Sequence, residues 1–278
     1  MITYAPAKIN LTLDVFNTRS DGFHEILTVF QTISLFDVIE WEVNDSGKFD
    51  IQCQLYEING HYNILWKAVK EYFKFANMPE KGFTAVVNKN IPIKSGLGGG
   101  SSDAAAIIMA LADMFKIYPP MEFFSALGAD VPFFTMRGTV LGKGKGEELT
   151  PLKPAENVFA VIVQGNSRIS TEKAYEIIDK LPEKKTINTQ ELINAIYADD
   201  FYALSRNCGN VFEQVAAEMS IWEIDAIKAT LSLNGASNAV MSGSGSAVYG
   251  LFNDENKARR CAEECRKDYQ FAQLTKFI

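Results

Sequence analysis

The stretch "PIKSGLGGGSSDAAA", Pro92 to Ala106, carries four glycines and three serines and then becomes alanine-rich. Glycine loses more conformational freedom on folding than any other residue, so this cluster indicates positive φ angles or a group that approaches the backbone closely. A helix start offers unpaired N–H groups and the positive end of the helix dipole, which together suit a phosphate. The stretch therefore predicts an anion cradle, with a flexible Gly-Ser linker as the alternative.

The flanking residues favour the cradle over the linker. After the glycines, residues 101–115 ("SSDAAAIIMALADMF") contain strong helix formers with apolar residues at helical spacing. Before them, residues 83–92 ("FTAVVNKNIP") alternate in the manner of a strand. Strand, glycine loop and helix in this order form a phosphate-binding arrangement, although neither GxGxxG nor GxxxxGK[ST] is present.

Length, charge and cysteine content narrow the class of protein. The 278 residues are enough for two domains, each with its own core. The formal net charge of -7 argues against binding to the phosphate backbone of nucleic acid. No signal sequence and no apolar run long enough for a membrane span is apparent, so we expect a cytoplasmic protein. Cys261 and Cys265 lack nearby histidines, which indicates buried or incidental thiols rather than a zinc site.

A change in amino-acid composition predicts a domain boundary near residue 150. The Gly-, Lys- and Pro-bearing stretch "GTVLGKGKGEELTPLKP" separates an N-terminal domain, 1–150, from a C-terminal domain, 151–278. The first domain contains the glycine loop and is expected to bind a nucleotide. Beyond the boundary, strands alternate with helices, which predicts an α+β domain with a mainly antiparallel, ferredoxin-like sheet.

Two N-terminal segments contain candidate binding residues. In "APAKINLTLDV" the apolar and polar residues alternate, so Lys8 and Asn10 share the strand face that points away from the core. A solvated strand face is the simpler interpretation. In "RSDGFHEI", the Asp-Gly turn presents Phe23 and His24. Either these are a core anchor and an incidental polar residue, or they stack on and hydrogen-bond a flat ligand.

Two further segments complete the set. Asp130 lies in the otherwise apolar "LGADVPFF", where an ionised carboxylate needs a partner. Structural pairing is the usual explanation, but a carboxylate near a lysine such as Lys8, beside bound phosphate, can activate a hydroxyl. The glycine-serine turn 242–246 in "MSGSGSAVYGLF" is either an ordinary turn or a second backbone wall against a nucleotide.

Five segments of the chain, in their order, resemble motifs of the GHMP superfamily of small-molecule kinases. They are "PAKINLTLDV", "RSDGFH", "IPIKSGLGGGSSDAAA", "LGADVPFF" and "MSGSGSAV". Within this superfamily, they are most similar to the branch that phosphorylates a cytidine diphosphate-linked methylerythritol in the non-mevalonate isoprenoid pathway. The resemblance implies an α+β, two-domain GHMP kinase fold with an N-terminal ribosomal-protein-S5-domain-2-like domain and a C-terminal ferredoxin-like domain. It implies transfer of the γ-phosphoryl group of ATP to the 2-hydroxyl of this small-molecule substrate, with Mg²⁺, and no nucleic acid, membrane or protein partner.

The same resemblance assigns roles to residues. Asp130 would be the general base or would orient the acceptor hydroxyl, and Lys8 would stabilise charge on that hydroxyl. The nucleotide set is Asn63, Lys89, Pro92, Ile93, Lys94, Ser95, Gly96, Leu97, Gly98, Gly99, Gly100, Ser101 and Ser102. The substrate set is Asn10, Phe23, His24 and Tyr175, with Phe23 at a position where the family usually has tyrosine. Phosphates and water can hold Mg²⁺, so no protein ligand is assigned to it.

Two alternatives stay open at this point. The phosphate loop alone fits another GHMP-type kinase that acts on homoserine, mevalonate or a sugar, although "DGFH" favours a cytidine pocket. A catalytically silent nucleotide-binding sensor is the alternative from another class. We expect such a relative to have lost the lysine or the aspartate, and this chain keeps both Lys8 and Asp130.

Overall fold

The computed structural model describes residues 1–278, which form two compact units. Unit 1 comprises Met1–Ala7, Leu35–Ile93 and Gly98–Met136, and unit 2 comprises Lys8–Ser34, Lys94–Leu97 and Arg137–Ile278. The units are interleaved along the chain because β1 (Ile2–Thr18), β2 (His24–Asn44) and the glycine loop each contribute residues to both. The division into domains 1–150 and 151–278 stays a prediction.

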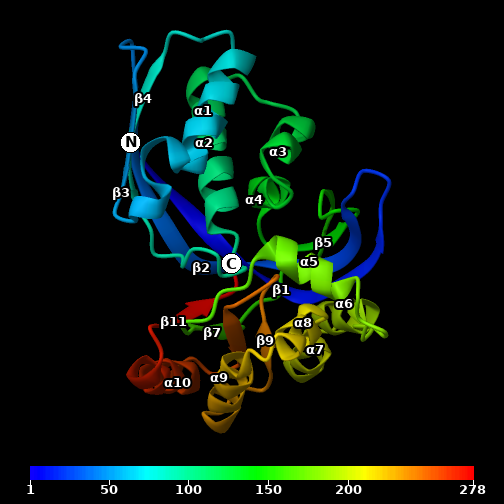
Figure 1. Ribbon diagram of the computed structural model, residues 1–278. Coiled ribbons are helices and arrows are strands. Elements are labelled where there is room, and N and C mark those ends of the chain that lie inside the picture. Colours follow the sequence, from blue (N-terminus) through cyan, green and yellow to red (C-terminus); the bar gives the residue numbers. More distant parts are fainter. The chain divides into compact units, whose positions relative to one another are not determined.

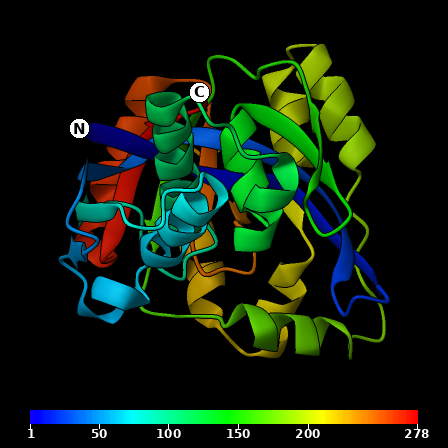
Figure 2. The same cartoon turned by 90° about the horizontal axis from the view of Figure 1, so that it is seen from above.

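Unit 1 contains a small sheet with helices beside it. Besides the first part of β1 and the last part of β2, its elements are β3 (Phe49–Cys53), the 3₁₀ turns η1 (Tyr56–Ile58) and η2 (Gly60–Tyr62), α1 (Ile64–Phe75), β4 (Gly82–Asn88), α2 (Gly99–Phe115), α3 (Met121–Leu127) and α4 (Val131–Met136). Strand β4 pairs antiparallel with β2 and parallel with β3. Figures 1 and 2 both show α1 and α2 side by side, and α2 also packs on α4.

The strand, glycine loop and helix predicted from the sequence are all present in unit 1. The β4 segment alternates in burial, with Phe83, Ala85 and Val87 buried. The α2 helix is buried from Ser102 to Ile108 and again at Leu111 and Ala112. It begins at Gly99, two residues before the predicted start, because Gly98 takes the left-handed conformation that ends the loop.

Unit 2 contains a second sheet that is entirely antiparallel. Its elements after the β2 strand are β5 (Thr139–Lys143), β6 (Glu148–Pro151), β7 (Phe159–Gln164), α5 (Thr171–Ile178), α6 (Thr189–Tyr197), α7 (Phe201–Asn207), β8 (Gly209–Asn210), α8 (Phe212–Glu218), α9 (Trp222–Leu233), β9 (Ala239–Met241), β10 (Val248–Phe252), α10 (Glu255–Asp268) and β11 (Phe271–Lys276). The sheet order is β11-β7-β10-β9, and α9 and α10 pack against it (Figure 1). This arrangement agrees with the predicted antiparallel α+β layer.

The remaining strands of unit 2 pair around the N-terminal strands. Strand β5 pairs antiparallel with β2 from Thr28 to Gln31 and also pairs with β6. Strand β1 pairs in parallel with the short β8 at Thr12 and Leu13. The core of this unit gathers side chains from β1, β7, β9, β10 and the helices α5, α8, α9 and α10, including both Cys261 and Cys265. The two thiols are therefore buried core groups, as expected.

The solvated strand face expected around Lys8 and Asn10 is wrong. Both residues are buried, and so are Thr12 and Asp14 on the same face of β1. Within unit 2, Thr12 contacts Thr189 and the Asp14 carboxylate accepts a hydrogen bond from the Ile187 N–H, so a later segment of the chain covers this face. Alternation of polar and apolar residues locates the two faces of a strand but does not tell which face another segment covers.

Candidate active site

The glycine loop ends at a helix start that no side chain caps. Gly98 is the N-cap of α2, with φ +72°, and it makes no side-chain cap hydrogen bond. A Cβ at Gly99 would lie 3.0 Å from Cγ2 of Ile91 and 3.2 Å from Nζ of Lys89, so the loop backbone packs directly against the end of β4. The first N–H groups of a helix have no intrahelical partner. The absence of side chains at Gly98, Gly99 and Gly100 leaves these groups open to an anion.

An orphaned hydroxyl lies at the same helix start. The Oγ of Ser102 is buried and has no hydrogen-bond partner, while the Ser102 N–H donates to the carbonyl of Gly98. A buried polar atom without a partner is costly and indicates a missing ligand, water or ion. The Ser102 hydroxyl and the uncapped N–H groups therefore fit a phosphate, or a cation that a phosphate brings with it.

Asp130 follows a turn that lies beside this helix start. The residue is half-buried and directly precedes α4, whose Val131, Phe133 and Phe134 are buried. A Cβ at Gly128, two residues earlier, would lie 4.0 Å from Oγ of Ser101 in the first turn of α2. The structure thus brings the turn before Asp130 next to the predicted phosphate site, within the same unit.

Asn63 and Lys89 use their side chains for contacts within unit 1. Asn63 caps α1 by accepting from the Leu65 N–H (3.1 Å), and its amide donates to the carbonyl of Ile58 (3.0 Å). The Lys89 ammonium donates to the carboxylates of Asp37 and Asp103, the latter at 2.6 Å. The roles of Asn63 and Lys89 at the nucleotide remain predictions.

In unit 2, Lys8 and Asn10 lie together. The Lys8 ammonium donates to Oδ1 of Asn10 (2.7 Å) and stands 5.3 Å from the ring centroid of Phe30. The Asn10 amide in turn donates to Oγ1 of Thr28 (2.8 Å). The two side chains are buried and orient each other, and the role of Lys8 remains a prediction.

The second glycine-serine turn supports the first part of the glycine loop. The Ser242 hydroxyl donates to the carbonyl of Gly96 (3.0 Å), and the Ala247 N–H donates to the carbonyl of Ser95 (3.0 Å). A Cβ at Gly96 would lie only 2.0 Å from the Ser242 carbonyl oxygen, so only glycine fits there. The Lys8 N–H also bonds the carbonyl of Leu97 (3.0 Å). Within unit 2, the turn therefore braces the loop and is more than an ordinary connection.

The predicted substrate residues His24 and Tyr175 form an aromatic stack in unit 2. Their rings are 4.6 Å apart with an interplanar angle of 26°. Nε2 of His24 lies 2.8 Å from a carboxylate oxygen of Asp179, which is one turn beyond Tyr175 on the α5 side. Tyr175 also meets the edge of Phe212 at 5.0 Å. A ring surface and an imidazole with a fixed partner thus lie together in unit 2, and their role in substrate binding remains a prediction.

Phe23 is not a core anchor. Half of its surface is exposed, and the ammonium of Lys145 stands 4.6 Å from its ring centroid. The ring is therefore available to a ligand, beside a positive charge that suits a diphosphate.

The sequence analysis missed four charged residues that contact candidate residues: Asp37 and Asp103 in unit 1, and Lys145 and Asp179 in unit 2. Only Asp103 carried a signal, because it follows the two serines of the glycine loop directly.

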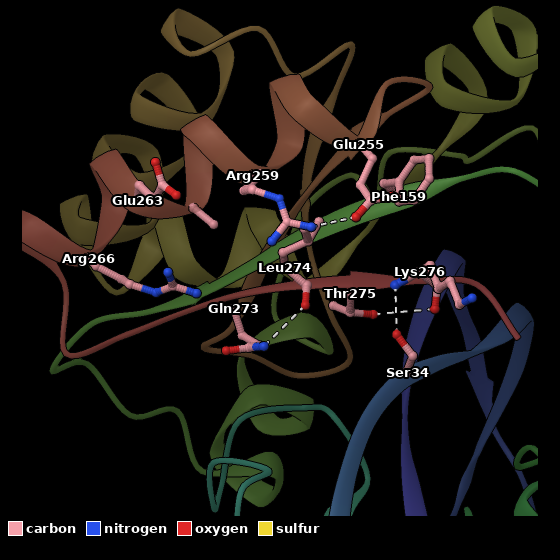
Figure 3. A pocket seen from close by; sticks show the side chains of 11 residues that line it. Ser34, Phe159, Glu255, Arg259, Glu263, Arg266, Gln273, Leu274, Thr275 and Lys276 are labelled. Carbon is pink, nitrogen blue, oxygen red and sulfur yellow. Dashed lines mark hydrogen bonds and ion pairs between the residues drawn. The ribbon is translucent and has the colours of Figure 1, made fainter.

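A separate pocket of about 380 Å³ lies on unit 2 between α10 and β11 (Figure 3). None of the predicted site residues lines it. Its charged side chains engage one another, as Arg259 and Glu255 do at 2.5 Å, and the backbone N–H of Lys276 bonds the Ser34 hydroxyl. This pocket therefore carries none of the chemistry described above.

Comparison with known proteins identifies the fold family. The model of the GHMP kinases N terminal domain matches residues 63–138, and that of GHMP kinases C terminal matches residues 192–270. The chain belongs to the GHMP kinase family. As in other GHMP kinases, the phosphate donor is ATP. The kinase is 37% identical to the 4-diphosphocytidyl-2-C-methyl-D-erythritol kinase of Lachnoclostridium phytofermentans, over 94% of this chain and 90% of that one.

Solved structures agree with this assignment. A crystal structure of 4-(cytidine 5'-diphospho)-2C-methyl-D-erythritol kinase matches with a TM-score of 0.83 and 31% identity, over 99% of both chains. A homoserine kinase from Cytophaga hutchinsonii matches with a TM-score of 0.72 but only 17% identity, over 100% of this chain and 97% of that one. The latter likeness shows the fold alone. No helix of this GHMP kinase combines the length and apolarity needed to cross a membrane.

Proposed function

We propose that this kinase transfers the γ-phosphoryl group of ATP to the 2-hydroxyl of 4-diphosphocytidyl-2-C-methyl-D-erythritol. One structural observation supports the donor side most directly, namely the uncapped start of α2 with the buried, orphaned Ser102 hydroxyl. The similarity to relatives that bear this substrate in their names supports the acceptor side.

Different residues of the chain would bind the triphosphate and carry out the phosphoryl transfer. The loop from Pro92 to Ser102 would hold the triphosphate through its N–H groups. Asp130 would accept or orient the proton of the acceptor hydroxyl, and Lys8 would stabilise the charge that develops there. Phosphoryl transfer demands mainly positioning and charge stabilisation, so these groups are sufficient once the substrates are held in line.

Mg²⁺ would supply charge neutralisation on the ATP phosphates. No group of three or more acidic, histidine or cysteine side chains is arranged to hold a metal ion. The Ser102 hydroxyl is the side chain that best fits a contact with the cation, and phosphates and water would provide the other ligands.

The cytidine and diphosphate side of the substrate would bind at Phe23, His24, Tyr175 and Asn10. The base would stack on an aromatic ring and bond the His24 imidazole. In the structure, Tyr175 occupies one face of His24, so a base must either stack on the outer surface of this pair or separate the two rings.

The test is ADP release from ATP and Mg²⁺ with the cytidylated substrate, beside homoserine, mevalonate and galactose. We expect turnover with the cytidylated substrate only. Turnover of one of the other acceptors would favour a different GHMP-type kinase. Binding of ATP without turnover of any acceptor would favour a nucleotide sensor.

A further inference from the structure

Three buried charged side chains connect the two flanks of the glycine loop in unit 1. Lys89 immediately follows β4, Asp37 lies on β2, and Asp103 lies in the first turns of α2. The exposed fractions of their side chains are 3%, 0% and 3%. Such groups are almost never buried in proteins unless they are paired.

Hydrogen bonds link these three side chains in a continuous series from β2 to α2. One carboxylate oxygen of Asp37 accepts from the backbone N–H groups of Asn90 (2.6 Å) and Ile91 (2.8 Å), and the other pairs with the Lys89 ammonium. Lys89 also donates to Oδ2 of Asp103 (2.6 Å). The residues that enter the loop and the helix that leaves it are thus tied to one ammonium group.

An unsatisfied buried atom makes a purely stabilising role a poor explanation for this cluster. Two carboxyl groups face one ammonium, and the second oxygen of Asp103 is buried without a partner. A buried ionic group of this kind stabilises a fold no better than well-packed apolar residues would. Because Lys89 Nζ would be 3.2 Å from a Cβ at Gly99, the ammonium lies directly against the loop. The position of the cluster and the position of the loop backbone are therefore coupled.

We propose that Asp37, Lys89 and Asp103 form a positioning cluster that holds the start of α2 in the geometry that receives the ATP phosphates. In this proposal Asp37 and Asp103 act through the loop backbone and not by contact with the nucleotide, and the proposal rests on the proposed kinase function. Hydrogen-bond donors that are held in position for a phosphate bind it less well after even a small displacement, so a shift of the first N–H groups of α2 would weaken their contact with ATP.

The experiment compares Asp103→Leu with Asp113→Leu, an exposed aspartate on the same helix. Leucine has a similar size and leaves Lys89 and Asp37 as a balanced pair. For each folded variant we would measure kcat, the KM for ATP, the KM for the cytidylated substrate, ATP affinity at equilibrium, and hydrogen exchange at Gly98–Ser102. For Asp103→Leu we expect ATP affinity to fall roughly tenfold, in line with loss of a charged hydrogen bond. Exchange at the loop should become faster, and the KM for the cytidylated substrate should stay near that of the wild type.

The outcomes separate this proposal from the proposed function. If Asp103→Leu binds ATP as Asp113→Leu does, or if both KM values rise together, the positioning role is wrong. If Asp103→Leu does not fold, Asp103→Asn decides, because its amide keeps an acceptor for Lys89 and should retain most ATP affinity; a loss shared equally by both substrates would contradict the proposal. If the wild type binds ATP but does not turn over the cytidylated substrate, the proposed function fails, while the ATP affinities still test the cluster.

Discussion

At the scale of single residues, Asp130 is the side chain on which the proposed chemistry depends most. Its carboxylate follows a turn that packs beside the first turn of α2, where the phosphates are expected. Replacement by asparagine keeps the size but removes the basic oxygen. We expect Asp130→Asn to lower kcat by roughly 100-fold or more, with little change in ATP affinity. Steady-state kinetics and ATP titration check this, with the exposed Asp113→Asn as the control.

Near-normal turnover in Asp130→Asn would remove this carboxylate from the mechanism. A parallel loss of ATP affinity would instead assign Asp130 to the nucleotide site.

Phe23 provides a second prediction at this scale. Its ring is half exposed and lies under the Lys145 ammonium. Loss of a stacking contact is worth on the order of 1 kcal/mol, so Phe23→Ala should raise the KM for the cytidylated substrate about fivefold. The KM for ATP should not change. Phe16→Ala is a matched control because Phe16 is also partly exposed and lies on β1 in the same unit. Equal kinetics in the two variants would exclude Phe23 from the substrate pocket.

At the scale of elements, the sequence predicted best where one residue type dictates a backbone conformation. The glycines at Gly96 and Gly98 predicted positive φ angles, and both have them. Asn188, a residue type that favours helix starts, caps α6 by accepting from the Glu191 N–H. These features depend on neighbours in the chain, which a sequence displays directly.

Features that depend on distant neighbours could not be predicted in the same way. Asp37 lies far from Lys89 in sequence, and Asp179 lies even further from His24, so no spacing pattern links either pair. The burial of Lys8 and Asn10 likewise depends on which later segments cover β1. The identities of the candidate residues could thus be proposed from the sequence, but their mutual contacts could not.

The positioning cluster also predicts how stability depends on pH. Burial raises the pKa of Asp103 from an ordinary value of 3.8 to about 8, with Asp37 opposing and Lys89 favouring ionisation. Besides Lys89 and Asp37, Cys53 is the titratable group that interacts with this cluster. Between these two pKa values the folded state binds more protons than the unfolded state, so the free energy of unfolding falls as pH rises through this window.

Asp103→Asn removes this titration. Relative to the variant, the wild type should lose stability toward pH 8 with a slope of at most about 1.4 kcal/mol per pH unit. Denaturant unfolding of both proteins at a series of pH values measures the difference. A difference that is constant with pH would mean that Asp103 stays ionised in the folded state, paired with Lys89.

At the scale of the whole molecule, five short motifs in order were enough to predict the family, and matches to both GHMP kinase models confirm it. The compact units were less predictable. A change in composition along the chain can predict a boundary between two consecutive domains. It cannot predict units that share long strands, as these two units share β1 and β2. The motifs succeed because each is a local loop or turn, whereas the units are defined by contacts between segments far apart in sequence.

The whole-molecule prediction concerns stabilisation by ligands. A ligand that binds only the folded state stabilises it by about 2.7 kcal/mol at a hundred times its Kd, which for a chain of this size corresponds to several degrees in Tm. We expect ATP with Mg²⁺ and the cytidylated substrate each to raise Tm, and chelation of Mg²⁺ to weaken the effect of ATP alone. Thermal unfolding with each ligand provides the measurement, and in Phe23→Ala only the response to the cytidylated substrate should become smaller. Stabilisation by ATP without any response to the cytidylated substrate would keep the phosphate loop and reject the cytidine pocket, because the two sites are built from different residues.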